Sequence, residues 1–115
     1  MPRDLGLYLE DMIEAVRRLQ EYLRGMTREA FVADPRTVDA VVRNLEILGE
    51  AAKNVPEPIR LRAPDVEWRK IAGLRDVLVH SYFQLDLAIV WDVATTKVPL
   101  LAVPIRRLLD GLEPT

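Results

Sequence analysis

Apolar side chains recur every three or four residues in four separate stretches of the chain. This spacing places them on one face of an α-helix and leaves polar residues on the other face. We therefore expect four main amphipathic helices, over about residues 5–24, 35–53, 68–80 and 87–98. The inward faces expected for the first, second and fourth helices consist of Leu5, Leu9, Met12, Val16, Leu19 and Leu23, then Val38, Val41, Val42, Leu45, Leu48 and Ala52, then Leu87, Val90, Trp91, Ala94 and Val98.

Start and stop residues stand at the expected helix boundaries. Asp4, Asp34 and Asp86 each precede an apolar repeat, where a carboxylate can accept hydrogen bonds from the amides of the first turn. The proline that follows Asp34 suits the first helical position. Gly25 suits the left-handed backbone conformation that often ends a helix. The sequence therefore predicts where three of the four helices begin and where the first one ends.

Shorter helical segments are expected between and after the main helices. Residues 27–33 can form one turn capped by their threonine, and the proline-rich connector 56–66 can hold another turn over residues 59–61. Pro99 and Pro104 lack the amide hydrogen that a helix interior needs. We expect them to kink or break the fourth helix and to leave a final helical piece beyond.

Length and composition fit one domain. The chain has 115 residues, of which 50% are hydrophobic, which is enough for a substantial core. It contains no internal repeat, low-complexity tract or linker. The predicted fold class is all-α: a single domain over residues 1–115, built as a bundle of four main helices with short helical segments.

Composition also limits the kinds of site that the chain can hold. The absence of cysteine removes disulfides, thiolate nucleophiles and thiolate metal ligands. A single histidine excludes a histidine-rich metal centre within one chain, so we expect no metal and no cofactor. No apolar run approaches the roughly 20 residues of a membrane span, and the N-terminus has no secretory apolar segment. We expect a soluble, cytoplasmic protein without membrane contact.

Basic side chains gather in one region although the whole chain is slightly acidic. The net charge is −2 and the pI about 5.4, so any contact with nucleic acid must use a local patch. The region 60–75 contains only two acidic residues before its last arginine, and its basic residues are Arg60, Arg62, Arg69, Lys70 and Arg75. A solvated edge and a groove for RNA phosphates are equally compatible with this pattern.

The segment 73–83 holds the side chains best suited to chemistry. It contains the only histidine, His80, five residues after Arg75 and two before Tyr82. These three residue types can together bind an anion, move a proton near neutral pH and exchange hydrogen bonds. On a straight helix, however, Arg75 and His80 are separated by about 140°. They converge only if the helix ends near His80, if Arg75 reaches round, or if a second copy of the chain supplies part of the site.

A structural interpretation of the same residues stands beside this one. A lone histidine among apolar residues is more often a hydrogen-bonded packing residue than a catalyst. Arg75 and Asp76 could form an ion pair that only stabilises the fold, and Tyr82 could be a half-buried core residue with its hydroxyl in water. The three residues alone therefore do not decide between catalysis and packing.

The sequence around these residues resembles that of the HepT-like HEPN toxins. The string Gly-Leu-Arg-Asp-Val-Leu-Val-His-Ser-Tyr-Phe at 73–83, which follows Trp-Arg-Lys-Ile-Ala at 68–72, is similar to the signature of that family. The segments Arg-Asn-Leu-Glu-Ile-Leu-Gly-Glu-Ala-Ala at 43–52 and Leu-Asp-Leu-Ala-Ile-Val-Trp-Asp at 85–92 resemble further family segments, in the family's order. The resemblance covers nearly the whole chain.

The resemblance implies a HEPN-like bundle that forms a homodimer, with the motifs of both chains meeting at a cleft. It implies a metal-independent endoribonuclease that acts on RNA as the toxin of a type VII-like toxin–antitoxin system. The implied antitoxin is an MntA-like nucleotidyltransferase, which silences the toxin by transferring AMP to a tyrosine. By the same resemblance Arg75 and His80 form the catalytic pair, Tyr82 is the AMP acceptor, and Asp76 can orient His80.

Two other functions remain open at this point. The bundle could be a non-catalytic subunit of a nucleotidyltransferase complex, in which Arg75, His80 and Tyr82 bind a nucleotide or fix the interface. It could also be a plain helical adaptor with a buried histidine, although this would leave the three family-like segments unexplained. An adjacent gene for a small nucleotidyltransferase would support the first two functions over the adaptor.

Overall fold

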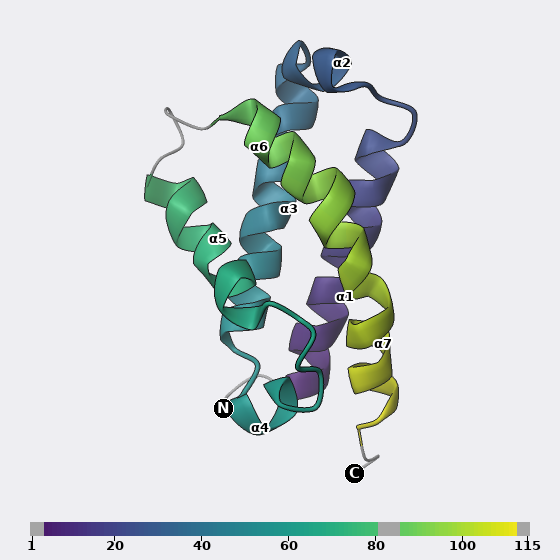
Figure 1. Ribbon diagram of the computed structural model, residues 1–115, viewed down its shortest axis with the longest axis vertical. Coiled ribbons are helices and arrows are strands. Elements are labelled where there is room, and N and C mark those ends of the chain that lie inside the picture. Colours follow the sequence, from purple (N-terminus) through teal and green to yellow (C-terminus); the bar gives the residue numbers. More distant parts are fainter. Residues whose placement is uncertain (1–3, 81–85, 113–115) are drawn as a thin grey trace.

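Helices are the only regular secondary structure in the described part of the chain (Figure 1). The computed structural model describes residues 4–80 and 86–112, and it describes Arg75, Val77, Val79 and His80 by their main chain alone. The predicted all-α fold is confirmed. In chain order the elements are α1 (Leu5–Leu23), α2 (Arg28–Val32), α3 (Pro35–Lys53), α4 (Glu57–Arg60), α5 (Trp68–His80), α6 (Leu87–Asp92), the π-helical turn η2 (Val93–Lys97), the 3₁₀ turn η3 (Val98–Leu101) and α7 (Ala102–Asp110).

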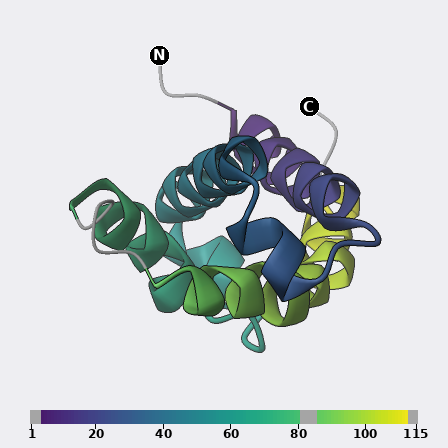
Figure 2. The ribbon, with the colours of Figure 1, turned by 90° about the horizontal axis from the view of Figure 1, so that it is seen from above.

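The main helices run alternately up and down (Figure 1). Helix α3 packs extensively against both α1 and α5, and α1 also packs against α7. Figure 2 shows α5 at one edge of the molecule, beside α3, and Figure 1 shows the run from α6 to α7 crossing in front of α3 and α1. Helix α3 therefore connects α5 with α1 and with the helices that pack on α1.

The core is built from the apolar stripes that the helical spacing predicts. All six of the inward-facing residues expected in α3 are buried, and in α1 the four inner positions from Leu9 to Leu19 are at most 2% exposed. Helix α2 adds Phe31, which is fully buried. The centroids of the Phe31 and Trp91 rings are 5.5 Å apart. This aromatic pair closes the end of the bundle where α2 meets α6.

The predicted caps are present. The carboxylates of Asp4, Asp34 and Asp86 each accept hydrogen bonds from main-chain amides in the first turn that follows, and the Thr27 hydroxyl does the same for α2. The pKa of Asp34 lies below its ordinary value, chiefly because the Thr37 hydroxyl and amide hydrogen-bond to its charged form. Gly25 has a φ of 75°, the left-handed conformation expected just after α1.

Arg60 fastens the connector to the end of α3. The turn expected over residues 59–61 is α4, which begins two residues earlier and ends at Arg60. The Arg60 guanidinium donates to the main-chain oxygens of Val55 at 2.9 Å and Ala52 at 2.8 Å, and its Cζ lies 5.8 Å from the centroid of the Trp68 ring. These bonds add a charged donor to carbonyls at and just beyond the C-terminal end of α3, where few main-chain donors remain. The same side chain thus links the end of α3 to the start of α5.

The prolines distort the last helical run without breaking it. Pro99 lies in the first turn of η3 and Pro104 in the first turn of α7, while η2 precedes both. The expected kink is present as a change from α-helix to π-helix to 3₁₀-helix, but the expected break is absent over the described residues 87–110. Altered helical hydrogen bonding around the prolines accommodates their missing amide hydrogens.

This last run also corrects an expectation about apolar length. Leu87–Asp110 is a helical run of 24 residues that includes a stretch with mean hydropathy 1.4, long and apolar enough by those measures alone to cross a membrane. The expectation that no apolar run approaches such a length is therefore wrong. The core helix of a globular bundle meets the same measures, and the side chains that this run buries recur every three or four residues: Val90, Ala94, Val98, Leu101, Ile105 and Leu108.

Two leucines provide a matched test of this core. Leu45 in α3 is 1% exposed, whereas Leu61 in the connector is 67% exposed. We expect Leu45→Ala to lower the free energy of unfolding by about 2–5 kcal/mol, because it removes buried methyl groups and leaves a cavity. Leu61→Ala should change it by less than about 0.5 kcal/mol. Urea unfolding followed by circular dichroism measures both, and equal effects would contradict the assignment of the core.

The contribution of the Arg60 hydrogen bonds to stability can also be tested by unfolding. We expect Arg60→Gln to lower the free energy of unfolding by about 1–3 kcal/mol, because three main-chain oxygens lose a charged donor. Arg69→Gln removes the same charge from an exposed side chain of α5 and should have little effect. If both variants melt at the wild-type temperature, Arg60 does not hold the connector.

Candidate active site

Helix α5, which carries the sequence motif, is anchored on α3 by one face. Ile71 and Leu78 are buried and Leu74 is half-buried, and the helical spacing places these three residues on one face of α5. Arg69 and Asp76 lie on the opposite side and are exposed. The main-chain course of α5 is therefore set by its contact with α3 rather than by contacts along its charged side.

The start of α5 is held by its first residue. Trp68 is 7% exposed, and its indole Nε1 donates to the main-chain oxygen of Ala63 at 3.1 Å. The Arg60 guanidinium lies over the same ring. The Glu67 main-chain oxygen accepts a hydrogen bond from the Ile71 amide at 3.0 Å, which begins the helical pattern. The connector and α5 therefore share one packed corner.

Arg75 and His80 lie on the last two turns of α5. The helix continues without interruption from Trp68 to His80, and His80 is its last residue. Five helical residues rotate the chain by about 500°, so the two main-chain positions face directions about 140° apart. All three ways in which the two side chains could meet, namely the helix end at His80, an Arg75 side chain that reaches round and a second copy of the chain, remain compatible with this backbone.

Of the other two predicted residues of the motif, Asp76 lies within the described part of the chain and Tyr82 does not. Asp76 lies one turn before His80 on α5 and is exposed. Tyr82, predicted to accept AMP, lies outside the described residues. The catalytic roles of Arg75 and His80, the supporting role of Asp76 and the modification of Tyr82 therefore stay predictions.

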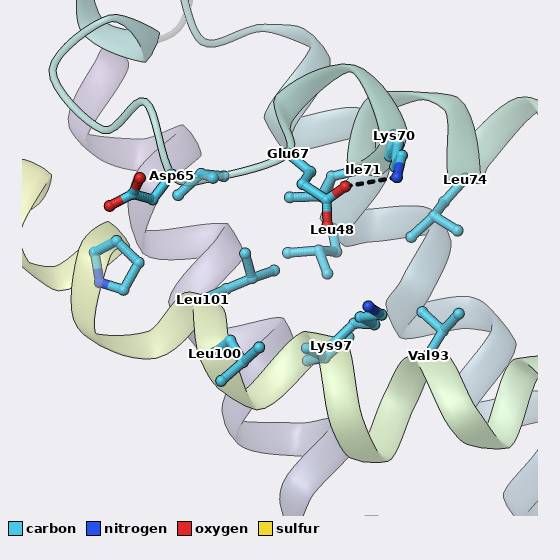
Figure 3. Close-up of a pocket in the computed structure, with 13 residues that line it drawn as sticks. Leu48, Asp65, Glu67, Lys70, Ile71, Leu74, Val93, Lys97, Leu100 and Leu101 are labelled. Carbon is cyan, nitrogen blue, oxygen red and sulfur yellow. Dashed lines mark ion pairs between the residues drawn. The ribbon is translucent and has the colours of Figure 1, made fainter.

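The four residues predicted to bind RNA have distinct surroundings. Arg60 is bonded to the end of α3, and Lys70 forms an ion pair with Glu67 at 2.7 Å (Figure 3). This pair raises the pKa of Lys70 and lowers that of Glu67, first through the hydrogen bond between them and then through their charges. Arg69 and Arg62 are exposed, and the Arg62 guanidinium reaches the end of α7 at Gly111. Arg69 and Arg62 are thus the two arginines of the set best placed for an incoming phosphate.

A groove beside α5 was not predicted from the sequence. It lies between the first half of α5 and the η2–η3 segment, with Leu48 of α3 among its lining residues, and its cavity volume is about 520 Å³ (Figure 3). Val93, an apolar residue outside the predicted inner face of the fourth helix, is the one sequence signal that pointed there. The π-helical turn that carries Val93 has no recognisable signal in the sequence.

Clusters of side chains that could bind a metal ion are absent from the described part of the chain. Over residues 4–80 and 86–112, no group of three or more histidine, aspartate or glutamate side chains is arranged to hold a metal ion.

Comparisons with known proteins agree with one another. The family described as Ribonuclease HepT-like matches residues 12–108, a range that contains the whole Arg-x4-His-x-Tyr string. No solved structure matches the chain at a significant level.

Three curated relatives match over nearly their full lengths. The chain is 37% identical to a provisionally named RNase of Methanocaldococcus jannaschii, over 98% of this chain and 94% of that protein. It is 39% identical to a provisionally named ribonuclease HepT of Thermococcus cleftensis, over 94% of this chain and 98% of that protein. It is also 39% identical to a provisionally named RNase of Caldanaerobacter subterraneus, over 90% of this chain and 92% of that protein. The chain therefore belongs to the HepT-like ribonuclease family.

Proposed function

We propose that this protein is a metal-independent endoribonuclease whose catalytic pair is Arg75 and His80. The observation that carries the proposal is the family match over residues 12–108, which spans the fold and the motif together. The relatives that match over nearly the whole chain bear ribonuclease names, which supports RNA as the substrate class. The continuous helix from Trp68 to His80 gives both residues a rigid main-chain support.

The proposed reaction needs a base and a cationic clamp. The 2′-hydroxyl of RNA attacks the adjacent phosphorus, the bond to the 5′-oxygen breaks, and a 2′,3′-cyclic phosphate forms. Neutral histidine, with an ordinary pKa near 6.5, suits removal of the hydroxyl proton and contributes about 10²–10⁴ in rate. The Arg75 guanidinium binds two phosphoryl oxygens and stabilises the charge that develops on them. Asp76, one turn before His80, can orient the imidazole through a hydrogen bond.

A homodimer completes this site in the proposal. Arg75 and His80 face directions about 140° apart along one α5, which makes a shared site within one helix difficult. A two-fold axis near the end of α5 would bring both copies of each residue to one cleft. One His80 could then act as base while the other protonates the leaving 5′-oxygen. Arg69 and Arg62, both exposed, would guide the RNA backbone into the cleft.

The same family relationship supports a proposal that a partner protein controls the activity. We place this cytoplasmic ribonuclease in a type VII-like toxin–antitoxin system, with an MntA-like nucleotidyltransferase as antitoxin. The Tyr82 oxygen would attack the α-phosphorus of ATP on the partner, forming a phosphodiester with AMP and releasing pyrophosphate. AMP on Tyr82, seven residues after Arg75, would place a bulky anion where the RNA phosphate binds and so block cleavage.

The catalytic role of His80 can be tested by RNA cleavage in excess chelator. We expect the wild type to cut RNA and His80→Ala to cut it about 10²–10⁴ times more slowly, because the variant lacks the general base. Circular dichroism should show equal helix content in both proteins. Cleavage that requires a divalent ion, or that survives His80→Ala, would overturn the mechanism. An unmodified wild type that cuts no RNA would instead indicate a non-catalytic binding subunit.

Modification of the tyrosine is tested by co-expression with an MntA-like nucleotidyltransferase. We expect the intact mass to increase by one adenylyl group in the wild type and in Tyr22→Phe, since Tyr22 lies on α1 outside the motif. Tyr82→Phe should remain unmodified. The modified wild type should no longer cut RNA, and treatment with a phosphodiesterase should restore cleavage. A mass increase in Tyr82→Phe would place the AMP on another residue.

A further inference from the structure

The groove between α5 and the η2–η3 segment has the size and lining of a small-molecule site. Its volume of about 520 Å³ falls within the range of roughly 300–1,000 Å³ that is usual for such sites. Apolar side chains from three elements dominate the lining: Ile71 and Leu74 from α5, Leu48 from α3, and Val93 from η2. Figure 3 shows these residues on opposite sides of one hollow. An apolar body is therefore the natural occupant.

A π-helical turn forms one wall of the groove. The turn η2 spans Val93–Lys97, and the hydroxyls of Thr95 and Thr96 donate to the main-chain oxygens of Trp91 and Asp92 one turn earlier. π-Helical turns are rare and are found frequently at functional sites. Both end residues of this turn line the groove. The irregular turn and the cavity thus coincide in space.

Two lysines line the groove, and only one of them forms an ion pair in the described chain. Lys70 is bound to Glu67 at 2.7 Å, so these two charges neutralise each other. Lys97 comes from the opposite wall and, among the residues that the structure describes, forms no ion pair (Figure 3). The pKa of Glu67 is lowered chiefly by its hydrogen bond with Lys70 and least by the charge of Lys97. The carboxylate of Asp65 is turned away from Lys97 at the far end of the groove (Figure 3).

We propose that the groove binds a small apolar monoanion, of the class of a medium-chain carboxylate. The hydrocarbon chain lies against Ile71, Leu74 and Val93, and the carboxylate lies beside the ammonium of Lys97. A single negative group matches the one lysine at the mouth that forms no ion pair in the described chain. Arg75 and His80 are not among the lining residues of the groove, and its occupancy does not depend on ribonuclease activity.

Isothermal titration calorimetry with decanoate, below its micelle-forming concentration, tests this proposal on the full chain. We expect saturable binding of one decanoate per chain, with affinity that increases about fourfold for each CH₂ between octanoate and decanoate. Lys97→Gln should weaken decanoate binding about fivefold and leave the binding of uncharged decanol unchanged. Lys53→Gln removes the same charge from an exposed lysine that does not line the groove, so its affinity should equal that of the wild type.

A second variant tests the groove itself. Val93→Phe fills the hollow from a half-buried position and should abolish the binding of both decanoate and decanol. Far-UV circular dichroism checks that the variant folds, and the Lys97→Gln comparison decides if it does not. The proposal is wrong if decanoate shows no saturable binding, or if Lys97→Gln binds it as tightly as Lys53→Gln does. It is also wrong if decanoate fails to bind and Val93→Phe changes the oligomeric state, because the groove is then an interface between protein chains.

Discussion

Burial of the α3 stripe is the constraint on which the rest of the structure depends. This helix packs against α1 on one side and α5 on another, and side chains such as Val41, Leu45 and Leu48 are at most 1% exposed. Because a helix can bury more than one face only when several neighbours cover it, the position of α3 fixes those of α1 and α5 together. The remaining run from α6 to α7 then closes the bundle over α1.

The position of α5 has two consequences for function. Its inner residues Ile71 and Leu78 attach it to α3, and Trp68 and Arg60 fix its first turn to the connector. The last two turns of this helix carry the proposed catalytic residues. Its first half also lines one side of the groove, opposite the η2–η3 segment and with Leu48 of α3 in the lining. The candidate catalytic end and the groove therefore both follow from how α5 rests on α3.

Pro99 and the π-helical turn η2 shape the side of the groove opposite α5. Pro99 lies in a 3₁₀ turn that directly follows η2, and no break separates these turns over the described residues 87–110. The change in helix type lets one run carry buried residues, such as Ala94 and Val98, toward the core while Lys97 reaches the groove. A regular α-helix with the same sequence would lack partners for the carbonyls that face the proline rings.

Local signals in the sequence determined much of this protein. The caps at Asp4, Asp34 and Asp86, the glycine after α1 and the buried stripes were all predictable, because each depends on residues within one or two turns. The order of three family-like segments likewise predicted the HepT-like family, which the comparisons confirm.

Only the tertiary structure decided which charged residues are already engaged. Arg60 and Arg69 are equivalent in a count of basic residues, yet one is bonded to the end of α3 and the other is exposed. The groove was equally unpredictable, because Leu48, Ile71 and Val93 come from three elements. Their relative placement depends on packing angles and on a π-helical turn, neither of which is encoded by a local repeat. Sequence spacing defines the face of each helix, whereas the space between helices is defined only when they pack.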